Sequence, residues 1–304
     1  MRWPLAGRSP RRRTERHDRV AQPSVAILGA GRMGQGLALT LGEAGHPVTL
    51  VSRSSHPVIP PLRLHSGPRE AALRNAAVVL LAVPDGAITS LAEELAAEGG
   101  ITARHVVLHL SGLRDREALG PLAETGAALG SLHPLQTVSD PATAAARFAG
   151  AYAGVEGDER ALAAAEALAR SLRMVPVRIP AGAKPAYHAG AAFAANYTTA
   201  LVAVAERLAL AAGIPPDVAR RLYLPLIRGA AANLEAGPAA ALTGPVRRGD
   251  VETVAAHLAA LGPEDRKLYL LLAREALRLA RDAGLPPEAA ARMGRVLGEP
   301  GAGG

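Results

Sequence analysis

The chain has 304 residues, of which 49% are hydrophobic and 20% are charged, so we expect a globular protein with one large domain or two medium ones. It has no cysteine, which excludes disulfides, thiolate catalysis and cysteine-bound metals, and its nine histidines lack the spacing of metal ligands. We therefore expect no metal site. Residues 1–20 carry +5 of the net charge of +7, so the remainder is nearly neutral and does not indicate a nucleic-acid-binding surface.

Residues 1–22 are rich in arginine and show no apolar periodicity, which predicts a disordered basic tail. This segment lacks the apolar run of a secretory signal. We expect a cytoplasmic protein with no nucleic-acid partner and no membrane partner.

The stretch from Val25 to Ser52 organises the rest of the chain. It has the pattern of an apolar strand, a glycine turn, a helix over Arg32–Ala44 and a second strand over Val48–Val51. The turn fits G-x-G-x-x-G, in which the glycines make a tight turn, let the backbone approach a pyrophosphate and allow close packing of helix on strand. The sequence therefore predicts a dinucleotide site formed by Gly29, Ala30, Gly31, Arg32, Met33 and Gly34.

The end of the second strand indicates which dinucleotide is bound. An acid is expected there when the ribose is unphosphorylated, but this position holds Ser52, Arg53 and Ser54. An arginine beside hydroxyl groups suits a 2′-phosphate, so we expect NADP(H). The blander alternative is a solvated strand end in an arginine-rich chain.

Strands and helices alternate up to Ile179, which predicts a doubly wound parallel sheet of the Rossmann type over residues 23–180. The strand over Val78–Val83 ends at the ligand side of such a sheet, which places Val83 and Pro84 beside the cofactor. Further strands are expected over Val106–Leu110, Ala127–Leu132, Ala151–Val155 and Val175–Ile179, and further helices over Ile88–Ala97 and Asp158–Leu172.

From residue 181 to 304 the pattern predicts an all-α domain. Its first helix, over Ala186–Ala212, has no polar face, which predicts burial in a helical bundle, either within one chain or shared with a second subunit. A membrane span is disfavoured because alanine inserts weakly and polar side chains interrupt the helix. Four more helices are expected over Pro216–Leu234, Val251–Ala260, Glu264–Ala283 and Pro287–Val296.

Four places are candidates for catalysis or substrate binding. His133 follows a strand, where an imidazole can face the ligand. Lys184, His188 and Asn196 lie at the start of the long helix, and Ser111 ends another strand. Arg247 and Arg248 follow a Gly-Pro turn and could clamp a carboxylate. Each has a structural alternative: backbone hydrogen bonding for His133, contacts between helices for Asn196, and solvation for Lys184 and the arginines.

Four stretches of the chain resemble, in their order, the motifs of one bacterial family. They are His109-Leu-Ser-Gly112, Ser131-Leu-His-Pro-Leu-Gln-Thr137, Tyr187-His188 to Asn196-Tyr197 and Leu242-Thr-Gly-Pro245 to Asp250. That family pairs a Rossmann-like domain with a C-terminal helical domain of unknown function. The chain also resembles the β-hydroxyacid dehydrogenase architecture of 6-phosphogluconate dehydrogenase, ketopantoate reductase, prephenate dehydrogenase and pyrroline-5-carboxylate reductase. The resemblance implies an NADP-linked oxidoreductase that is dimeric through its helical domain. In the hydroxyacid dehydrogenases an asparagine follows the helix lysine by four residues, whereas here His188 stands at that distance from Lys184.

The sequence thus predicts an NADPH-dependent reductase of a small anionic 2-oxo acid, with ketopantoate as the first candidate because some relatives are associated with pantothenate synthesis. His188 or Lys184 would supply the proton in an interdomain cleft, and Asn196 and His133 would orient the substrate. Ser111, Arg247 and Arg248 would bind it. Two alternatives stay open: imine reduction of the pyrroline carboxylate type, and a non-catalytic NADP-binding regulator.

Overall fold

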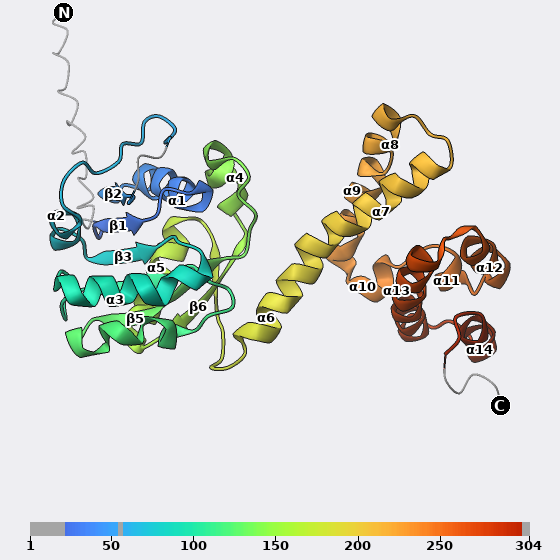
Figure 1. Ribbon diagram of the computed structural model, residues 1–304. Coiled ribbons are helices and arrows are strands. Elements are labelled where there is room, and N and C mark those ends of the chain that lie inside the picture. The colour runs from blue at the N-terminus through green and yellow to red at the C-terminus, as the bar shows by residue number, and fades with distance from the viewer. Residues whose placement is uncertain (1–21, 54–56, 300–304) are drawn as a thin grey trace, which may run out of the picture. The chain divides into compact units, whose positions relative to one another are not determined.

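The computed structural model describes residues 22–53 and 57–299. The chain folds as two compact units, and the division falls between Ala192 and Phe193 (Figure 1). The first unit therefore keeps the helix α6 (Lys184–Ala191), which the sequence assigns to the second domain. The predicted basic tail, residues 1–22, falls almost wholly outside the described residues.

The first unit contains a seven-stranded sheet in the order β2-β1-β3-β4-β5-β6-β7. The four strands from β2 to β4 pair in parallel with their neighbours, and β5 continues this direction. The strands are β1 (Val25–Leu28), β2 (Val48–Val51), β3 (Val78–Leu81), β4 (Val106–His109), β5 (Ala128–Pro134), β6 (Tyr152–Gly157) and β7 (Val175–Arg178).

The sheet is not wholly parallel, which corrects one detail of the prediction. Strand β6 pairs antiparallel with β5, and β7 then runs parallel to β6. A parallel return needs a crossover of a dozen or more residues that carries the chain back along the sheet. The only helices between β5 and β6 are the short η3 (Pro141–Thr143) and α4 (Ala144–Phe148), so β6 begins near the end at which β5 stops.

Alternate strand residues face two separate apolar cores, as expected for a sheet covered on both sides. Val25 and Ile27 pack with α1 (Arg32–Glu43), α4 and α5 (Glu159–Ser171). Ala26 and Leu28 pack on the other face with α2 (Arg69–Arg74), α3 (Ile88–Glu98) and η2 (Arg116–Thr125). The carboxyl ends of the five parallel strands thus meet at one edge, which is where α/β sheets bind ligands.

The second unit is helical, as predicted, and has its own core around Val254, Leu258, Leu277, Met293 and Leu297. It begins with a π-helical turn, η4 (Ala192–Tyr197), that continues α6 into α7. The remaining elements are α7 (Thr198–Ala211), α8 (Pro216–Leu222), α9 (Leu224–Asn233), η5 (Leu234–Ala236), α10 (Pro238–Ala241), α11 (Pro245–Arg248), α12 (Val251–Ala260), α13 (Pro263–Asp282) and α14 (Pro287–Val296).

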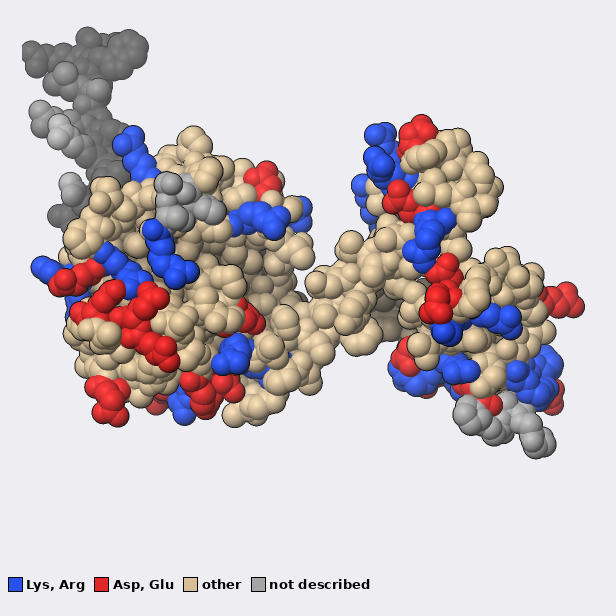
Figure 2. All heavy atoms as spheres, viewed as in Figure 1, with Lys and Arg blue, Asp and Glu red and all other residues tan. Residues whose placement is uncertain are grey.

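Helix α7, the first long helix of this unit, is not buried within one chain, and its burial against a second subunit stays a prediction. Phe193 is 70% exposed, Leu201 is 39% exposed, and Ala209 is the buried residue of α7. No charged residue occurs between Lys184 and Glu206, and Figure 2 shows the corresponding surface without charged side chains. Among the described residues, no helix combines the length and the apolarity needed to cross a membrane.

Candidate functional site

Three glycines give the β1–α1 turn its shape, and each has a different geometric role. Gly29 has φ +122°, and a Cβ there would lie 2.2 Å from the carbonyl oxygen of Ala82. A Cβ on Gly34 would lie 2.0 Å from the carbonyl oxygen of Gly29. Gly31, by contrast, faces open space, with nothing within 4 Å of an added Cβ. The first and third glycines therefore allow the backbones to pack, and Gly31 leaves room for a ligand.

The turn ends at the N-terminus of α1, where an anion is favoured. Gly31 is the N-cap residue and provides no side chain to cap the helix, and the first turn contains no acid. The N–H groups of this turn and the helix dipole are thus available to a phosphate. Arg32, Met33 and Gly34 are the first residues of this helix.

A cavity of about 580 Å³ lies beside the turn. Of the residues predicted to bind the cofactor, it is lined by Gly29, Ala30, Gly31, Ser52, Arg53, Val83 and Pro84. Ser54 falls outside the described residues. The structure adds wall residues that the sequence analysis missed. They come from the loop before α2, the start of α2, the short 3-10 helix before α3, and α3: His65, Gly67, Arg69, Ala87, Ser90, Leu91 and Glu94. The volume, the glycine turn and the helix terminus fit a dinucleotide.

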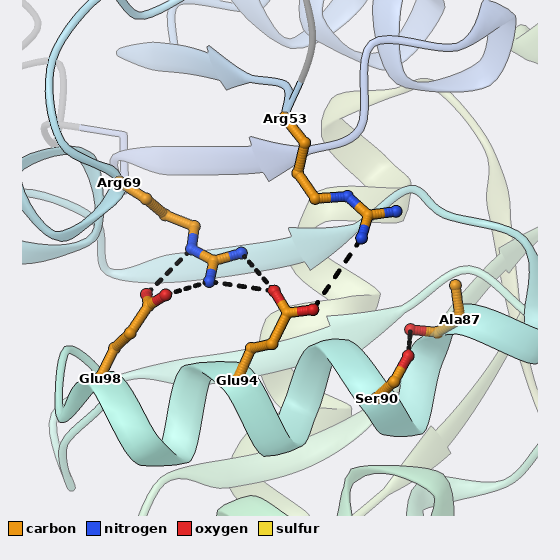
Figure 3. Close-up of polar contacts among 6 residues, drawn as sticks. All are labelled: Arg53, Arg69, Ala87, Ser90, Glu94 and Glu98. Carbon is orange, nitrogen blue, oxygen red and sulfur yellow. Dashed lines mark hydrogen bonds and ion pairs between the residues drawn. The ribbon is translucent and has the colours of Figure 1, made fainter.

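Arg53, Arg69 and Glu94 line one wall of this cavity and form a charged array with Glu98, which lies outside the lining (Figure 3). Arg69 donates to Glu98 Oε2 at 3.0 Å and to Glu94 Oε2 at 3.3 Å. The other carboxylate oxygen of Glu94 lies 3.9 Å from Arg53 Nη1. The Arg53 side chain is 78% exposed, whereas that of Arg69 is only 17% exposed. Arg69 is therefore held in place in the cavity wall, whereas the Arg53 side chain can reorient.

A second polar cluster centres on Lys184, which is only 2% exposed. Its Nζ donates to the backbone oxygen of Ser111 at 2.8 Å and to Ser131 Oγ at 2.7 Å. Burial lowers the pKa of Lys184 to about 8, although the carboxylates of Glu156, Asp115 and Asp85 act in the opposite direction. Because a buried ammonium needs acceptors, this lysine is not the solvated surface residue that the alternative interpretation supposed.

Ser111 links the cluster to the turn after β3. Its Oγ donates to Asp85 Oδ2 at 2.7 Å and accepts from the backbone N–H of Arg114 at 2.8 Å. Asp85 directly follows Pro84, which lines the cavity, so the cluster and the cavity share this turn. His109, at the end of β4, is completely buried, and this burial lowers its pKa to about 4.

His133 and His188 lie together against the backbone of Gly112. Their ring centroids are 5.8 Å apart, and a Cβ on Gly112 would lie 2.7 Å from His133 Cε1 and 2.5 Å from His188 Cδ2. His133 Nδ1 shares a hydrogen bond of 2.9 Å with the hydroxyl of Tyr187. Burial, followed by the charges of His188 and Lys184, lowers the pKa of His133 to about 4. His133 is therefore neutral at physiological pH and can act as a hydrogen-bond donor.

The other predicted site residues lie in the second unit. Asn196 is exposed on the π-helical turn. Arg247 donates to the backbone oxygen of Ala283 at 2.9 Å, at the C-terminal end of α13, and Arg248 is exposed. Substrate binding by these arginines stays a prediction.

The sequence analysis missed several residues of the Lys184 cluster. Asp85 directly follows a predicted strand end, which is the signal that could have found it. Ser131 and Glu156 carry no such signal, because their approach to Lys184 depends on the pairing of β5 with β6. Among the described residues, no group of three or more histidine, aspartate or glutamate side chains could hold a metal ion.

Models of two protein families match separate parts of the chain. Residues 10–134 match a model of a Rossmann-like domain, and residues 151–276 match a domain of unknown function, DUF2520. No curated protein matches the chain by sequence.

Solved structures share the fold at low sequence identity. A candidate NADP oxidoreductase from Bacteroides fragilis is 23% identical, with a TM-score of 0.63 over 84% of this chain and 98% of that one. Pyrroline carboxylate reductase from Plasmodium falciparum, solved with NADP bound, is 12% identical, with a TM-score of 0.56 over 91% and 98%. An imine reductase from a Pseudomonas species is 19% identical, with a TM-score of 0.53 over 91% and 95%. The chain thus has a fold shared with nicotinamide-dependent oxidoreductases, and it joins a Rossmann-like domain to a DUF2520 domain.

Proposed function

We propose that this protein is an NADP(H)-dependent oxidoreductase that reduces a small 2-oxo acid, with ketopantoate as the first candidate. The observation that carries the proposal is the closeness of the buried Lys184 cluster to the cavity beside the glycine turn. Asp85 of the cluster directly follows Pro84, which lines the cavity. An oxidoreductase of this type needs a dinucleotide cradle with a proton donor close by.

The cofactor would be held by residues of known geometry. The N-terminus of α1 and the open space at Gly31 would receive the pyrophosphate. Arg53 would bind the 2′-phosphate, and Val83 and Pro84 would contact the dinucleotide from the end of β3. When bound, NADPH supplies the hydride.

Lys184 is the proposed proton donor. A pKa of about 8 leaves it protonated at neutral pH but able to release the proton readily. Its ammonium has three N–H groups, and the described residues accept from two of them, which leaves one for the substrate oxygen. Neutral His133 would donate a hydrogen bond that orients the substrate, with His188 beside it.

Imine reduction is the second candidate, and the likeness to pyrroline carboxylate and imine reductases favours it. The same proton donor would serve a reduced nitrogen as well as a reduced oxygen. A panel of 2-oxo acids and cyclic imines separates the two, because only one class should give turnover at low substrate concentration.

The test of the proposed function is direct. NADPH and NADH are titrated into the purified protein by calorimetry, and NADPH oxidation is then followed with ketopantoate, other 2-oxo acids and 1-pyrroline-5-carboxylate. Tight NADPH binding with turnover on one compound is expected. Tight binding without any turnover would favour a non-catalytic regulator, and no binding of either nucleotide would refute the proposal.

We also propose that the protein is a homodimer through its helical part. The exposed apolar residues of the second unit support this: Phe193, Tyr197, Leu201, Leu210, Val218, Leu222, Leu224, Leu226, Leu234, Leu271 and Leu272. Exposed apolar surface on this scale is uncommon in a monomer. Light scattering on the purified chain should give twice the mass of 31.1 kDa, and a monomer would contradict the proposal.

A further inference from the structure

The charged array on the cavity wall suggests how the protein discriminates between the two nicotinamide cofactors. We infer that Glu94 limits the preference for NADP(H) over NAD(H), because its carboxylate pairs with Arg53 in the place of the 2′-phosphate. This inference rests on the proposed binding of NADP(H) in the cavity.

The two oxygens of Glu94 have different partners (Figure 3). Oε2 accepts from Arg69 Nη1 and Nη2, both at 3.3 Å, whereas Oε1 faces Arg53 Nη1 at 3.9 Å. A carboxylate is thus already placed as the anionic partner of the arginine that the 2′-phosphate needs. Any NADP(H) that binds through Arg53 has to take this arginine away from Glu94.

Arg69 keeps Glu94 in this position. The Arg69 side chain is 17% exposed and is also held by Glu98, to which it donates from Nε and Nη2. A guanidinium held by two carboxylates is pre-organised and loses little by staying in place. Arg69 is therefore a positioning residue, and Glu94 does not follow Arg53 when that side chain moves.

The 2′-phosphate can displace Glu94 from Arg53 because the ion pair between these two residues is weak. The Arg53 and Glu94 side chains are 78% and 42% exposed, and ion pairs exposed to this degree contribute little. A phosphate carries more charge and offers bidentate acceptors to a guanidinium, so it displaces the carboxylate. Glu94 therefore lowers the affinity for NADP(H) without preventing binding, and it has no such effect on NAD(H), which has no 2′-phosphate.

The chain provides a matched pair of variants. Glu94→Gln and Glu98→Gln each remove one carboxylate from Arg69, but only Glu94 lines the cavity and faces Arg53. Dissociation constants for NADPH and NADH are measured for the full chain and both variants at one ionic strength, because salt screens exposed pairs. E94Q should bind NADPH about two- to five-fold more tightly and NADH unchanged, in line with the loss of one exposed ion pair. E98Q should leave the ratio of the two constants unchanged.

A double variant identifies the arginine involved. In the Arg53→Met background, E94Q should give no gain for NADPH, because the arginine for which it competes has been removed. Three results would overturn the inference. E94Q could change the affinity for NADPH and NADH equally, E98Q could gain as much affinity for NADPH as E94Q does, or E94Q could still gain affinity for NADPH in the R53M background. If the unaltered protein binds neither nucleotide, the proposed function itself fails, and this outcome is distinct from the others.

Discussion

The Nζ atom of Lys184 lies 2.7 Å from the hydroxyl oxygen of Ser131, although 53 positions separate the two residues in the chain. The Ser131 hydroxyl in turn lies 3.4 Å from Glu156 Oε2, on the neighbouring antiparallel strand. The buried ammonium is therefore connected through one hydroxyl to a carboxylate that is only partly buried. We expect the proton of a lysine that is only 2% exposed to exchange along this path.

The first prediction concerns the pH dependence of reduction. In the proposed mechanism the protonated form of Lys184 is the proton donor. Because burial lowers its pKa to about 8, kcat should be constant below that pH and fall as the pH rises through it. Lys184→Met should remove this alkaline fall in kcat (the alkaline limb of the pH profile) and lower kcat by about 100-fold or more. The only other lysine provides the control: Lys267 pairs with Glu264 at the surface, and K267M should keep the wild-type profile.

The second prediction concerns the stability of the same variant. Between pH 8 and 10.5 the unfolded chain binds a proton at Lys184 that the folded chain does not, so the free energy of unfolding rises with pH in this range. Below pH 8 the buried charge therefore opposes folding. K184M should unfold at a higher temperature than the wild type at pH 7, and its advantage should shrink as the pH rises from 8 towards 10. An advantage that does not depend on pH would contradict this account.

The third prediction tests the path from Lys184 to Glu156. After burial, the charge of Glu156 is the largest influence on the pKa of Lys184, and it raises that pKa. Glu156→Gln should therefore move the alkaline limb of kcat to lower pH while leaving the affinity for NADPH unchanged. Glu159, exposed at the start of α5, provides the control, and E159Q should leave the limb in place. If both variants behave like the wild type, the carboxylate does not act on the lysine.

The fourth prediction concerns the space between the histidines. A methyl group on Gly112 would lie within 2.8 Å of both imidazoles, so Gly112→Ala should displace the rings and lower kcat strongly without weakening NADPH binding. Gly190→Ala is the matched control, because nothing lies within 4 Å of its added methyl group and alanine favours the helix α6. G190A should be as active as the wild type. If G112A were as active as the wild type, the two histidines would have no role in catalysis.

Much of the fold can be predicted from the sequence because its signals are local. The apolar strand, the glycine turn and the helix from Arg32 lie within one short stretch, and their periodicity specifies a strand–turn–helix unit without distant contacts. The reversed direction of β6 could not be predicted in this way. It depends on how far the segment around α4 carries the chain, which apolar patterns do not encode.

The candidate site is predicted well where a motif specifies it and poorly where tertiary contacts do. Gly29, Gly31 and Arg53 were identified because the motif assigns a position to each. Glu94 was not, because nothing in the sequence of α3 indicates that one carboxylate of its exposed face meets arginines from two other elements. The same reasoning applies to Lys184, for which the sequence indicates the helix start but not the burial.

The fifth prediction separates the two roles of the glycine turn. Gly31 has φ −68° as the N-cap of α1 and faces open space, so Gly31→Ala should lower the free energy of unfolding by no more than about 1 kcal/mol, the cost of an alanine at this cap position. Its methyl group would stand where the pyrophosphate approaches, so NADPH affinity should fall roughly tenfold or more.

Gly34→Ala should behave differently, because its methyl group meets the carbonyl oxygen of Gly29 at 2.0 Å. The helix has to move away from the turn, which should lower the free energy of unfolding by about 1–3 kcal/mol as well as weaken NADPH binding. Thermal unfolding and calorimetric titration of the two variants measure both quantities. If G31A lost stability and kept its affinity, the open space at Gly31 would not be the pyrophosphate site, and the dinucleotide would have to bind elsewhere along the carboxyl ends of the strands.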